Sequence, residues 1–395
     1  MREARMEKLE FVDRRGTNSA KWDGLEKMFG RTDLHSMWVA DMDFKAPLAV
    51  RKALSEYAER GAFGYMASPD SFYRAAMDWE MRNHDYRIER EWIRFSPGVV
   101  TAFHIAVKIF TEGGDSVMVN TPVYYPFFKA AESNGRKLVK SPLKYSDGKY
   151  SIDFEKFSRD IEENNVKLYI LCSPHNPVGR VWTAEELRRV LDICREHGVM
   201  VVSDEIHHDL IAPGVKFVPA LQCGKPGEYD QMVIALTAPS KTFNLAAGQN
   251  SLVIIPDEEL RSKWDAFAGS ISMTSGNPMG YIAGEAAYNE GESWYNQLIH
   301  QIYEVNFPLL NNILEQELPG VTVTDLQGTY LSWIDLSKVM DPSEVEKAVL
   351  EKGKLAVDFG HWFGGESFSG FVRMNLAAPE EYVEKGARAL VSAVK

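Results

Sequence analysis

The sequence is poor in cysteine and contains no long apolar run. Its three cysteines, Cys172, Cys194 and Cys223, show no C-x-x-C spacing, so they offer neither a disulfide framework nor a thiolate metal site. No stretch of about 18 apolar residues is available to span a bilayer, and the N-terminal residues are too charged for a signal peptide. We therefore expect a cytoplasmic protein in a reducing compartment.

Positive charge is also scarce. Lys and Arg number 44 against 56 Asp and Glu, which gives a formal net charge of −12. Such a charge repels nucleic acids and anionic membrane surfaces, so we expect neither as a partner. The 395 residues, 45% of them hydrophobic, are enough for a large core and for about two or three domains.

Strand and helix patterns alternate along the first two thirds of the chain. Helical spacing of apolar residues occurs at 47–57 and 98–110, and short buried strands are predicted at 116–120, 167–172 and 232–236. A capping box at 183–186 begins a helix that should end near Gly198, before a strand at 199–203. This alternation predicts an α/β fold with a mostly parallel sheet covered by helices on both faces.

The last third of the chain has a different pattern. It begins with helices and continues with a strand at 330–334 and a final helix near 379–394. We predict a smaller α+β domain formed by residues 1–45 and 284–395, and a large α/β domain formed by residues 46–283.

Four polar residues follow predicted strands directly: Tyr124, Asn176, Asp204 and Lys241. Ligands of parallel sheets collect at the carboxyl ends of the strands, so these side chains can converge. Lys241 lies beside Ser240 and a turn with free backbone N–H groups, which suits an amine that holds a carbonyl cofactor next to a phosphate. Taken singly, each residue has a simpler explanation, such as a surface lysine, a capping aspartate, an Asn-Pro turn or a core tyrosine.

Eight motifs in order resemble a known family. They are 38–44 (WVADMDF), 63–65 (FGY), 97–100 (PGVV), 122–127 (PVYYPF), 174–180 (PHNPVGR), 203–207 (SDEIH), 240–244 (SKTFN) and 371–375 (FVRMN). The chain resembles fold-type I pyridoxal-phosphate enzymes of the class I/II aminotransferase superfamily, specifically the MalY/PatB-type carbon-sulfur lyases. The resemblance implies the aspartate aminotransferase-like fold, with a mostly parallel seven-stranded sheet, and pyridoxal 5′-phosphate as the cofactor.

The resemblance also implies roles around the cofactor ring. Lys241 would bind the cofactor covalently and act as the base at the substrate Cα, and Asp204 would pair with the pyridine nitrogen. Asn176 would donate to the phenolic oxygen, and Tyr124 would stack on the ring and hand a proton to the departing sulfur. His207 stands where ordinary aminotransferases of this superfamily tend to carry a tyrosine, which favours the lyase branch.

The phosphate and the substrate have their own expected contacts. The phosphate would lie against the start of a helix at Gly98, Val99 and Val100, where free N–H groups and the helix dipole attract anions, and against Ser240. The resemblance implies that Tyr65 reaches the phosphate of the neighbouring subunit, and hence a homodimer with shared active sites. The substrate is expected to be a small amino acid, bound by Ala40, Asn176 and Arg373, with Arg373 clamping its α-carboxylate.

The sequence departs from the family near the lysine. Ala247 stands where a glycine is usual, Gln249 where a basic residue is frequent, and Ala238 where many members have serine. The loss of an arginine-like contact would weaken phosphate binding by about 1 to 3 kcal/mol.

These features predict a PLP-dependent β-elimination on cystathionine, cysteine or S-substituted cysteines, which gives a thiol, pyruvate and ammonia. One alternative is an aminotransferase using the same residues; another is a lyase that also binds a regulatory protein. The acidic and histidine residues of 204–209 could be taken for a metal site, but H-E-x-x-H is absent and the cofactor motif accounts for the segment, so we expect no metal.

Overall fold

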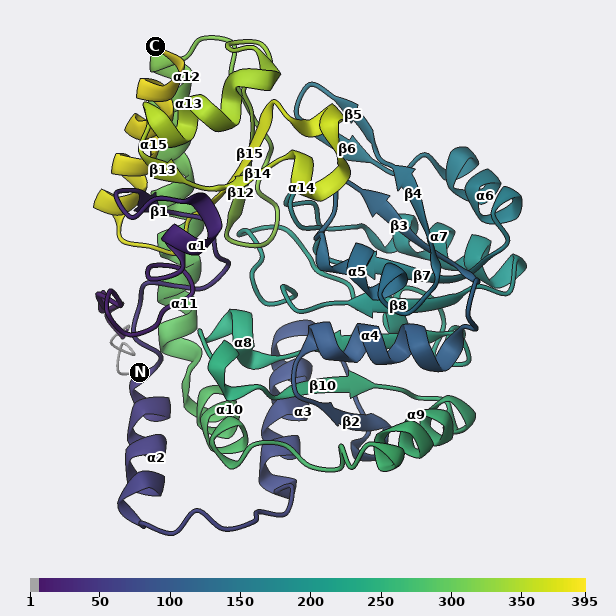
Figure 1. The fold of residues 1–395 in the computed structure, drawn as a ribbon. Coiled ribbons are helices and arrows are strands. Elements are labelled where there is room, and N and C mark those ends of the chain that lie inside the picture. The colour runs from purple at the N-terminus through teal and green to yellow at the C-terminus, as the bar shows by residue number, and fades with distance from the viewer. Residues whose placement is uncertain (1–6) are drawn as a thin grey trace.

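A seven-stranded sheet forms the centre of the larger part of the molecule (Figure 1). The structure is a computed structural model that describes residues 7–395, so residues 1–6 of the predicted small domain lie outside it. The strand order is β2-β10-β9-β8-β7-β3-β4, and β10 is antiparallel to both of its neighbours while the other pairs are parallel. The predicted α/β fold with a mostly parallel seven-stranded sheet is confirmed.

The strands are short, and all except the two edge strands are almost wholly buried. They are β2 (Ile93–Ser96), β3 (Ser116–Thr121), β4 (Lys137–Pro142), β7 (Val166–Cys172), β8 (Met200–Asp204), β9 (Val233–Thr237) and β10 (Ser251–Ile254). In β7, Leu168 and Ile170 pack on one face of the sheet while Tyr169 and Leu171 pack on the other. Strands buried on both faces have continuous apolar sequences, which is why the apolar runs predicted β3, β7, β8 and β9.

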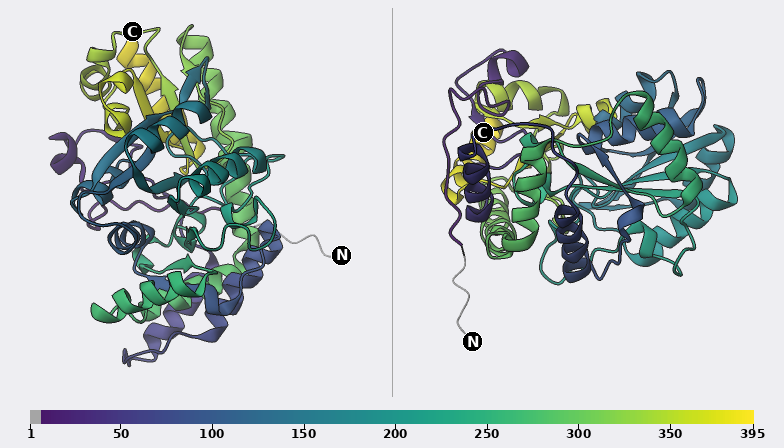
Figure 2. Two further views of the ribbon diagram at one scale, coloured as in Figure 1. Left: turned by 90° about the vertical axis from the view of Figure 1, so that its right-hand side faces the viewer. Right: turned by 90° about the horizontal axis from the view of Figure 1, so that it is seen from below.

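Helices cover both faces of this sheet (Figure 2). One face packs against α4 (Val99–Phe110), α5 (Pro126–Glu132) and α9 (Glu258–Ser270), and the other against α6 (Phe154–Glu163) and α7 (Ala184–Glu196). The predicted capping box of α7 is present: Thr183 Oγ1 accepts from the Glu186 N–H at 3.1 Å, and Glu186 Oε2 accepts from the Thr183 N–H at 2.9 Å. These two bonds pair N–H groups at the start of α7 and so fix where the helix begins.

Three further helices pack together through α10. They are α2 (Leu48–Glu59), α3 (Asp70–His84) and α10 (Pro278–Glu290), and α10 packs on both α2 and α3. The predicted domain boundary between residues 283 and 284 falls inside α10, and the division into two domains stays a prediction. The short helices α1 (Leu25–Phe29), α8 (Pro239–Thr242) and α14 (His361–Gly364) lie in the connecting segments.

A second, antiparallel sheet of four strands lies in the C-terminal part. Its order is β11 (Thr322–Val323), β12 (Leu331–Asp335), β15 (Phe371–Asn375) and β14 (Asp358–Phe359), and it is accompanied by α12 (Phe307–Glu317), α13 (Val345–Glu351) and α15 (Glu380–Val394). A long rod of α11 (Glu292–His300), a π-helical segment (Gln301–Asn306) and α12 runs up to this sheet (Figure 1). A separate two-stranded parallel sheet of β1 (His35–Ser36) and β13 (Leu355–Ala356) joins the N-terminal segment to the C-terminal part.

The remaining strands are β5 (Lys144–Ser146) and β6 (Lys149–Ser151), which form a hairpin. Among residues 7–395, none of the helices has both the length and the apolar character needed to cross a bilayer.

Candidate active site

A cavity of about 300 Å³ opens where several strands of the large sheet end. Ten of the residues predicted from the sequence line it: Ala40, Gly98, Val99, Val100, Tyr124, Asn176, Asp204, His207, Ser240 and Lys241. They come from widely separated segments that the parallel topology brings to one edge of the sheet. Thr101, Cys172, Ile206 and Gln249 also contribute to the lining.

Lys241 lies in α8, four residues after the end of β9. Its Nζ donates a hydrogen bond to the Ala40 carbonyl at 2.6 Å. Burial lowers the pKa of the amine to about 8, although the negative charge of Asp41 acts in the opposite direction and raises it. The amine therefore loses its proton far more readily than a solvated lysine does, as a base or a nucleophile requires.

Asp204 is the last residue of β8 and is buried at the same edge. Burial raises the pKa of its carboxyl group to about 7, although the Ile206 N–H, which donates to it at 3.2 Å, and the charge of Lys241 both lower it. A buried carboxyl group with a pKa near neutrality can share a proton with a basic ring nitrogen.

The segment around Ala40 is fixed from several sides. The Tyr330 hydroxyl donates to the same Ala40 carbonyl at 2.8 Å, and Asn375 Nδ2 donates to the carbonyls of Val39 and Asp41, both at 2.6 Å. These contacts place the acceptor of the Lys241 hydrogen bond on a backbone that is held by the second sheet.

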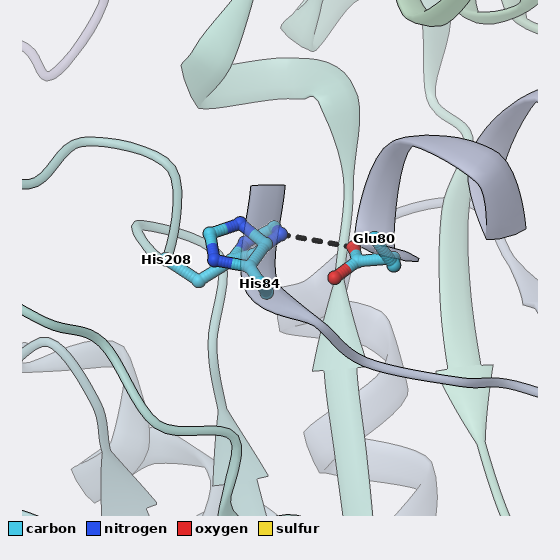
Figure 3. A group of neighbouring side chains, drawn as sticks. All are labelled: Glu80, His84 and His208. Carbon is cyan, nitrogen blue, oxygen red and sulfur yellow. Dashed lines mark hydrogen bonds and ion pairs between the residues drawn. The ribbon is translucent and has the colours of Figure 1, made fainter. Parts of the chain in front are cut away.

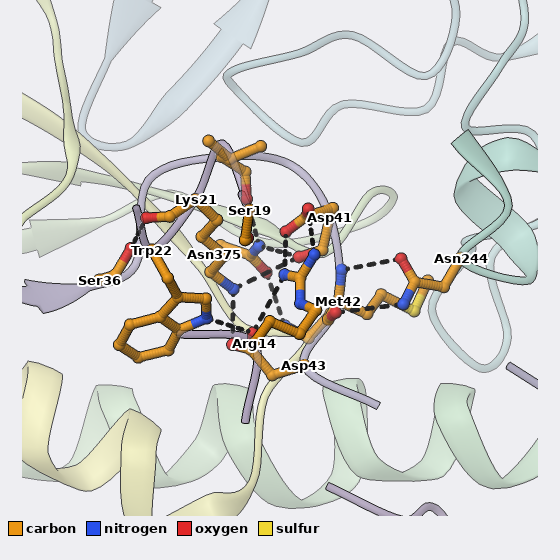
Figure 4. A network of polar contacts seen from close by, with 12 residues as sticks. Arg14, Ser19, Lys21, Trp22, Ser36, Asp41, Met42, Asp43, Asn244 and Asn375 are labelled. Atoms are coloured by element: carbon orange, nitrogen blue, oxygen red, sulfur yellow. Dashed lines mark hydrogen bonds and ion pairs between the residues drawn. The ribbon is translucent and has the colours of Figure 1, made fainter. Parts of the chain in front are cut away.

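Asn244 joins this segment to the lysine segment from the other side (Figure 4). Its Nδ2 donates to the carbonyls of Met42 at 3.1 Å and Phe44 at 3.0 Å, and its Oδ1 accepts from the Met42 N–H at 3.2 Å. Asn244 has a left-handed backbone with φ 58°, which asparagine tolerates better than most residues.

A buried charge network supports the same segment (Figure 4). Asp43 is fully buried and accepts from Lys21 Nζ at 2.6 Å, from Trp22 Nε1 at 2.9 Å and from Arg14 at 3.2 Å. Arg14 also holds Asp41 through two bonds of 2.8 Å. Buried charges are stable only when paired in this way, so the network fixes the course of the chain into the cavity.

We expect Asn244→Ala to lower the free energy of unfolding by about 2 kcal/mol, because three hydrogen bonds to residues 42–44 are lost. Urea unfolding would measure the change. Asn165→Ala is the matched control, since Asn165 also has a left-handed backbone, with φ 47°, but its side chain contacts an exposed lysine. Equal losses in both variants would assign the effect to backbone conformation and contradict the prediction.

Arg373 lies on β15 at the edge of the cavity and contacts one of its lining residues. Its Nη1 donates to Asn176 Oδ1 at 3.0 Å, and Nη2 donates to the Trp38 carbonyl at 3.2 Å and pairs with Asp358. Its Nε is buried and has no hydrogen-bond partner among the described residues. A planar guanidinium held with an unpaired donor is suited to a carboxylate ligand.

Tyr124 and His207 also line the cavity. Burial raises the pKa of the Tyr124 phenol and lowers the pKa of His207 well below its usual range. Both side chains are therefore uncharged near neutral pH. His207 Nδ1 is buried and has no hydrogen-bond partner among residues 7–395.

The start of α4 forms the opposite end of the cavity. Gly98 precedes the helix, and the N–H groups of its first turn, at Val99, Val100 and Thr101, have no acceptor within the helix. Ser240 lies on the same lining. Free N–H groups, a hydroxyl group and the positive end of the helix dipole together fit a phosphate.

Tyr65 is placed differently from the other predicted residues. It lies in the segment between α2 and α3, its side chain is fully exposed, and it is outside the set that lines the cavity. A role at the cavity of the same subunit is therefore not supported by the structure, whereas a contact with a second subunit remains a prediction.

Two residues with a clear place at the site were not predicted. Asp358 pairs with Arg373, and burial raises the pKa of its carboxyl group to about 6 despite that pairing. Tyr330 shares the Ala40 carbonyl with Lys241. A charged residue within the apolar run 355–359 was the available signal for Asp358, whereas Tyr330 looks like an ordinary strand residue.

The fold and the cavity together define a pyridoxal-phosphate-dependent enzyme. A lysine with a lowered pKa, a buried carboxylate, an unpaired imidazole nitrogen and a phosphate-binding helix start match the reactive groups of that cofactor.

The comparisons with known proteins agree. A model of the family described as aminotransferase class I and II matches residues 36–390. The chain is 40% identical over 385 residues to cystathionine beta-lyase PatB of Bacillus subtilis, which covers 97% of this chain and 98% of PatB. The chain belongs to the aminotransferase class I and II family, and PatB and the MalY protein of Escherichia coli, to which it is 32% identical over 389 residues, are among its relatives.

Two solved structures that contain the cofactor are closely similar. The PLP-bound C-S lyase from Staphylococcus hominis has a TM-score of 0.91 and 32% identity, over 98% of this chain and 97% of that one. Cystalysin from Treponema denticola has a TM-score of 0.92 and 33% identity, over 98% of both chains. The predicted family and its cofactor, pyridoxal 5′-phosphate, are confirmed.

Proposed function

We propose that this protein is a carbon-sulfur lyase that eliminates a thiol from the Cβ atom of L-cysteine-type amino acids, such as cystathionine or S-substituted cysteines. The observation that supports it most directly is that a lysine amine with a lowered pKa and the buried Asp204 line one cavity, beside Arg373. The products are a thiol, pyruvate and ammonia.

The cofactor would be held by residues of four segments. Lys241 would supply the amine for its aldehyde, Asp204 would pair with its ring nitrogen, Asn176 and His207 would contact its phenolic oxygen, and the start of α4 would bind its phosphate. When bound, pyridoxal phosphate provides an electron sink for the negative charge that develops at the substrate Cα.

The protein's own side chains would then bind the substrate and move its protons. Arg373 holds the α-carboxylate, and the neutral Lys241 amine takes the proton from Cα. The Cβ–S bond breaks, the sulfur leaves with the electron pair, and a proton converts it to the thiol. The enamine that remains is hydrolysed by water to pyruvate and ammonia.

The proton that the sulfur takes up comes from Lys241. The sequence led us to expect Tyr124 as the donor, but burial raises the pKa of its phenol, whereas the pKa of the Lys241 ammonium is about 8. Lys241 is therefore the stronger acid once it has taken the Cα proton. Tyr124 keeps its hydrogen and can donate a hydrogen bond to the sulfur as negative charge develops there.

An aminotransferase is the second candidate, because it would use the same lysine, aspartate and arginine. The similarity to PatB and to the Staphylococcus hominis C-S lyase favours elimination, as does His207 in place of a tyrosine. The two activities differ in their requirements, since transamination needs a keto acid as second substrate and elimination does not.

Pyruvate release by the PLP-loaded enzyme tests the proposal. L-Cystathionine, L-cysteine and S-methyl-L-cysteine would each be supplied with and without 2-oxoglutarate, and pyruvate would be read with lactate dehydrogenase. We expect pyruvate and free thiol in equal amounts without the keto acid. Turnover that depends on 2-oxoglutarate, with glutamate formed and no thiol, would overturn the lyase proposal in favour of the aminotransferase.

The rate of elimination should rise with pH toward a plateau above about pH 8. The reactive form of Lys241 is the neutral amine, and its pKa is about 8, so protonation removes the base as the pH falls. Asp41→Asn should move the inflection to lower pH, because the charge of Asp41 raises the pKa of the amine. Initial rates at saturating substrate between about pH 6 and 10 measure both effects. An inflection that stays in place in Asp41→Asn contradicts the assignment to Lys241.

We expect Gln249→Arg to bind pyridoxal phosphate at least about 10-fold more tightly. Gln249 lines the cavity at the position where the family often carries a basic residue, and a charged hydrogen bond to phosphate contributes about 1.5 to 3 kcal/mol. Fluorescence titration of the apoenzyme with the cofactor measures the change. Gln222→Arg is the control for added positive charge, because Gln222 is exposed. Equally tighter cofactor binding in both variants would contradict the local contact with the phosphate that is expected of Gln249→Arg.

We also propose a homodimer in which Tyr65 of one subunit serves the phosphate site of the other. Its full exposure in the single chain supports this, since a tyrosine without packing partners is suited to an intersubunit contact. Mixing inactive Lys241→Ala with Tyr65→Ala subunits should restore activity, because one site of the mixed dimer regains both residues. Mixing that yields no more activity than the Tyr65→Ala subunits alone would count against shared sites.

A further inference from the structure

Behind the lysine segment lies a buried cluster of ionisable side chains that the proposed reaction does not use. It consists of Glu80, His84 and His208 (Figure 3), with Asp209 beside the two histidines. Glu80 and His84 are one turn apart on α3, so they share a face of that helix. His208 and Asp209 lie in the turn after β8. The exposed fraction of each side chain is 6% or less.

We propose that this cluster is a binding site for a divalent transition-metal ion, and that zinc is the ion its donors fit best. One ligand atom from each of Glu80, His84 and His208 lies within 4.8 Å of the others. Asp209 Oδ1 lies 2.7 Å from His84 Nε2 and 3.6 Å from His208 Nε2, so it offers a fourth donor. Zinc takes four nitrogen and oxygen ligands at about 2.0 to 2.2 Å, which places the donors of one site about 3.2 to 3.6 Å apart.

The donors are oriented by a surrounding layer of hydrogen bonds. His208 Nδ1 lies 2.7 Å from the Glu205 carbonyl, to which it donates, so that Nε2 points into the cluster. Asp209 Oδ2 accepts from the Thr242 hydroxyl at 2.6 Å, and Asp209 Oδ1 accepts from Trp79 Nε1 at 2.9 Å. Histidine ligands of zinc characteristically donate their other nitrogen to a carbonyl or carboxylate, and carboxylate ligands are held by donors of this kind.

The same groups form two pairs with one another. His84 Nε2 contacts Asp209 Oδ1, and His208 Nε2 contacts Glu80 Oε1 at 2.9 Å. An ion that enters between the pairs replaces the protons that they share, so the four groups stay satisfied in both states.

The ion can reach the cluster from solvent. His84 also lines an open cavity of about 410 Å³, together with Asp85, Ile211 and Phe217. His84 is thus the outermost ligand, and the other three lie behind it.

The position of the cluster gives the ion a structural role close to the active site. Thr242, which donates to Asp209, is the residue after Lys241. A metal ion would join α3, the turn after β8 and α8 at one point. The two halves of the site, Glu80 with His84 and His208 with Asp209, lie more than 120 positions apart in the sequence, so no local pattern such as H-E-x-x-H contains them all.

Zinc binding to the PLP-loaded enzyme tests the proposal. After removal of metals with a chelator, the protein would be titrated with Zn²⁺ by calorimetry, and the bound zinc would be counted by elemental analysis after desalting. We expect one zinc ion per chain and a raised melting temperature. His84→Gln and Glu80→Gln should each weaken binding at least about 10-fold, as the loss of a ligand does.

His300→Gln is the matched control. His300 forms an exposed pair with Glu304 at 2.8 Å with the same spacing of four residues, so it measures adventitious binding by a surface pair. Loss of the stoichiometric zinc in His300→Gln but not in His84→Gln would overturn the proposal. If the variants fail to fold, Co²⁺ titration of the wild-type protein decides: absorption typical of four-coordinate cobalt supports the site, and its absence overturns it.

Discussion

Lys241→Ala is expected to reduce pyruvate release from an S-substituted cysteine by at least about 1000-fold. A positioned base contributes about 10² to 10⁴ in rate, and alanine also removes the amine that holds the cofactor. The pKa of about 8 makes Lys241 suited to take a proton from Cα and to return it to the sulfur. The coupled pyruvate assay measures the loss of rate. It is run with excess pyridoxal phosphate, so that weaker binding of the cofactor does not by itself lower the rate.

Two variants separate the base from the charge. Lys241→Arg keeps a positive charge but cannot lose its proton near neutral pH, so it should be as inactive as the alanine variant. Lys263→Ala removes a half-exposed lysine that pairs with Glu259 at 2.8 Å, and it should keep full activity. Activity within about tenfold of wild type in Lys241→Arg would show that charge, and not proton transfer, is what the site needs.

The sequence predicted the parts of the fold that depend on local pattern. Strand β8 and helix α7 were placed to within two residues, because apolar runs and a capping box are signals contained in a few neighbouring residues. The convergence of Tyr124, Asn176, Asp204 and Lys241 followed from topology, since each lies within four residues of the carboxyl end of a strand of one mostly parallel sheet. The motifs then assigned chemistry to the residues that the sheet brings together.

The parts that depend on tertiary contacts could not be predicted. Asp358 pairs with an arginine on a neighbouring antiparallel strand, and nothing in its own segment shows which residue lies beside it. The same holds for the Glu80, His84 and His208 cluster, because Glu80 and His84 lie on α3 whereas His208 lies in the turn after β8. The predicted domain boundary at residue 284 falls within α10. This helix contacts both α2 and α3, and these contacts are not visible in its own sequence.

The position of Arg373 shows how the two sheets cooperate. The arginine comes from β15 of the second sheet, while Asn176, which accepts from it at 3.0 Å, follows β7 of the first. The substrate's carboxylate would therefore be fixed by one sheet and the base supplied by the other. The relative placement of the two sheets then determines how well Cα meets Lys241.

Arg373→Lys is expected to lower kcat/KM for an S-substituted cysteine by about 100-fold. Lysine keeps the charge but cannot form two parallel hydrogen bonds to a carboxylate, and a charged hydrogen bond contributes about 1.5 to 3 kcal/mol. The charge that Asp358 needs is retained, so the fold should survive, which Arg373→Ala does not guarantee because it leaves a buried carboxylate unpaired. Steady-state kinetics should show most of the loss in KM.

Arg94→Lys is the matched control for this substitution. Arg94 forms a bidentate pair with Asp265, at 2.6 and 2.9 Å, but on the surface and away from the cavity. It should leave kcat/KM unchanged, which shows that the exchange of arginine for lysine is harmless elsewhere. If Arg373→Lys lowers kcat and leaves KM unchanged, the arginine acts on the transition state and not as the carboxylate anchor, and the substrate must be held by another group.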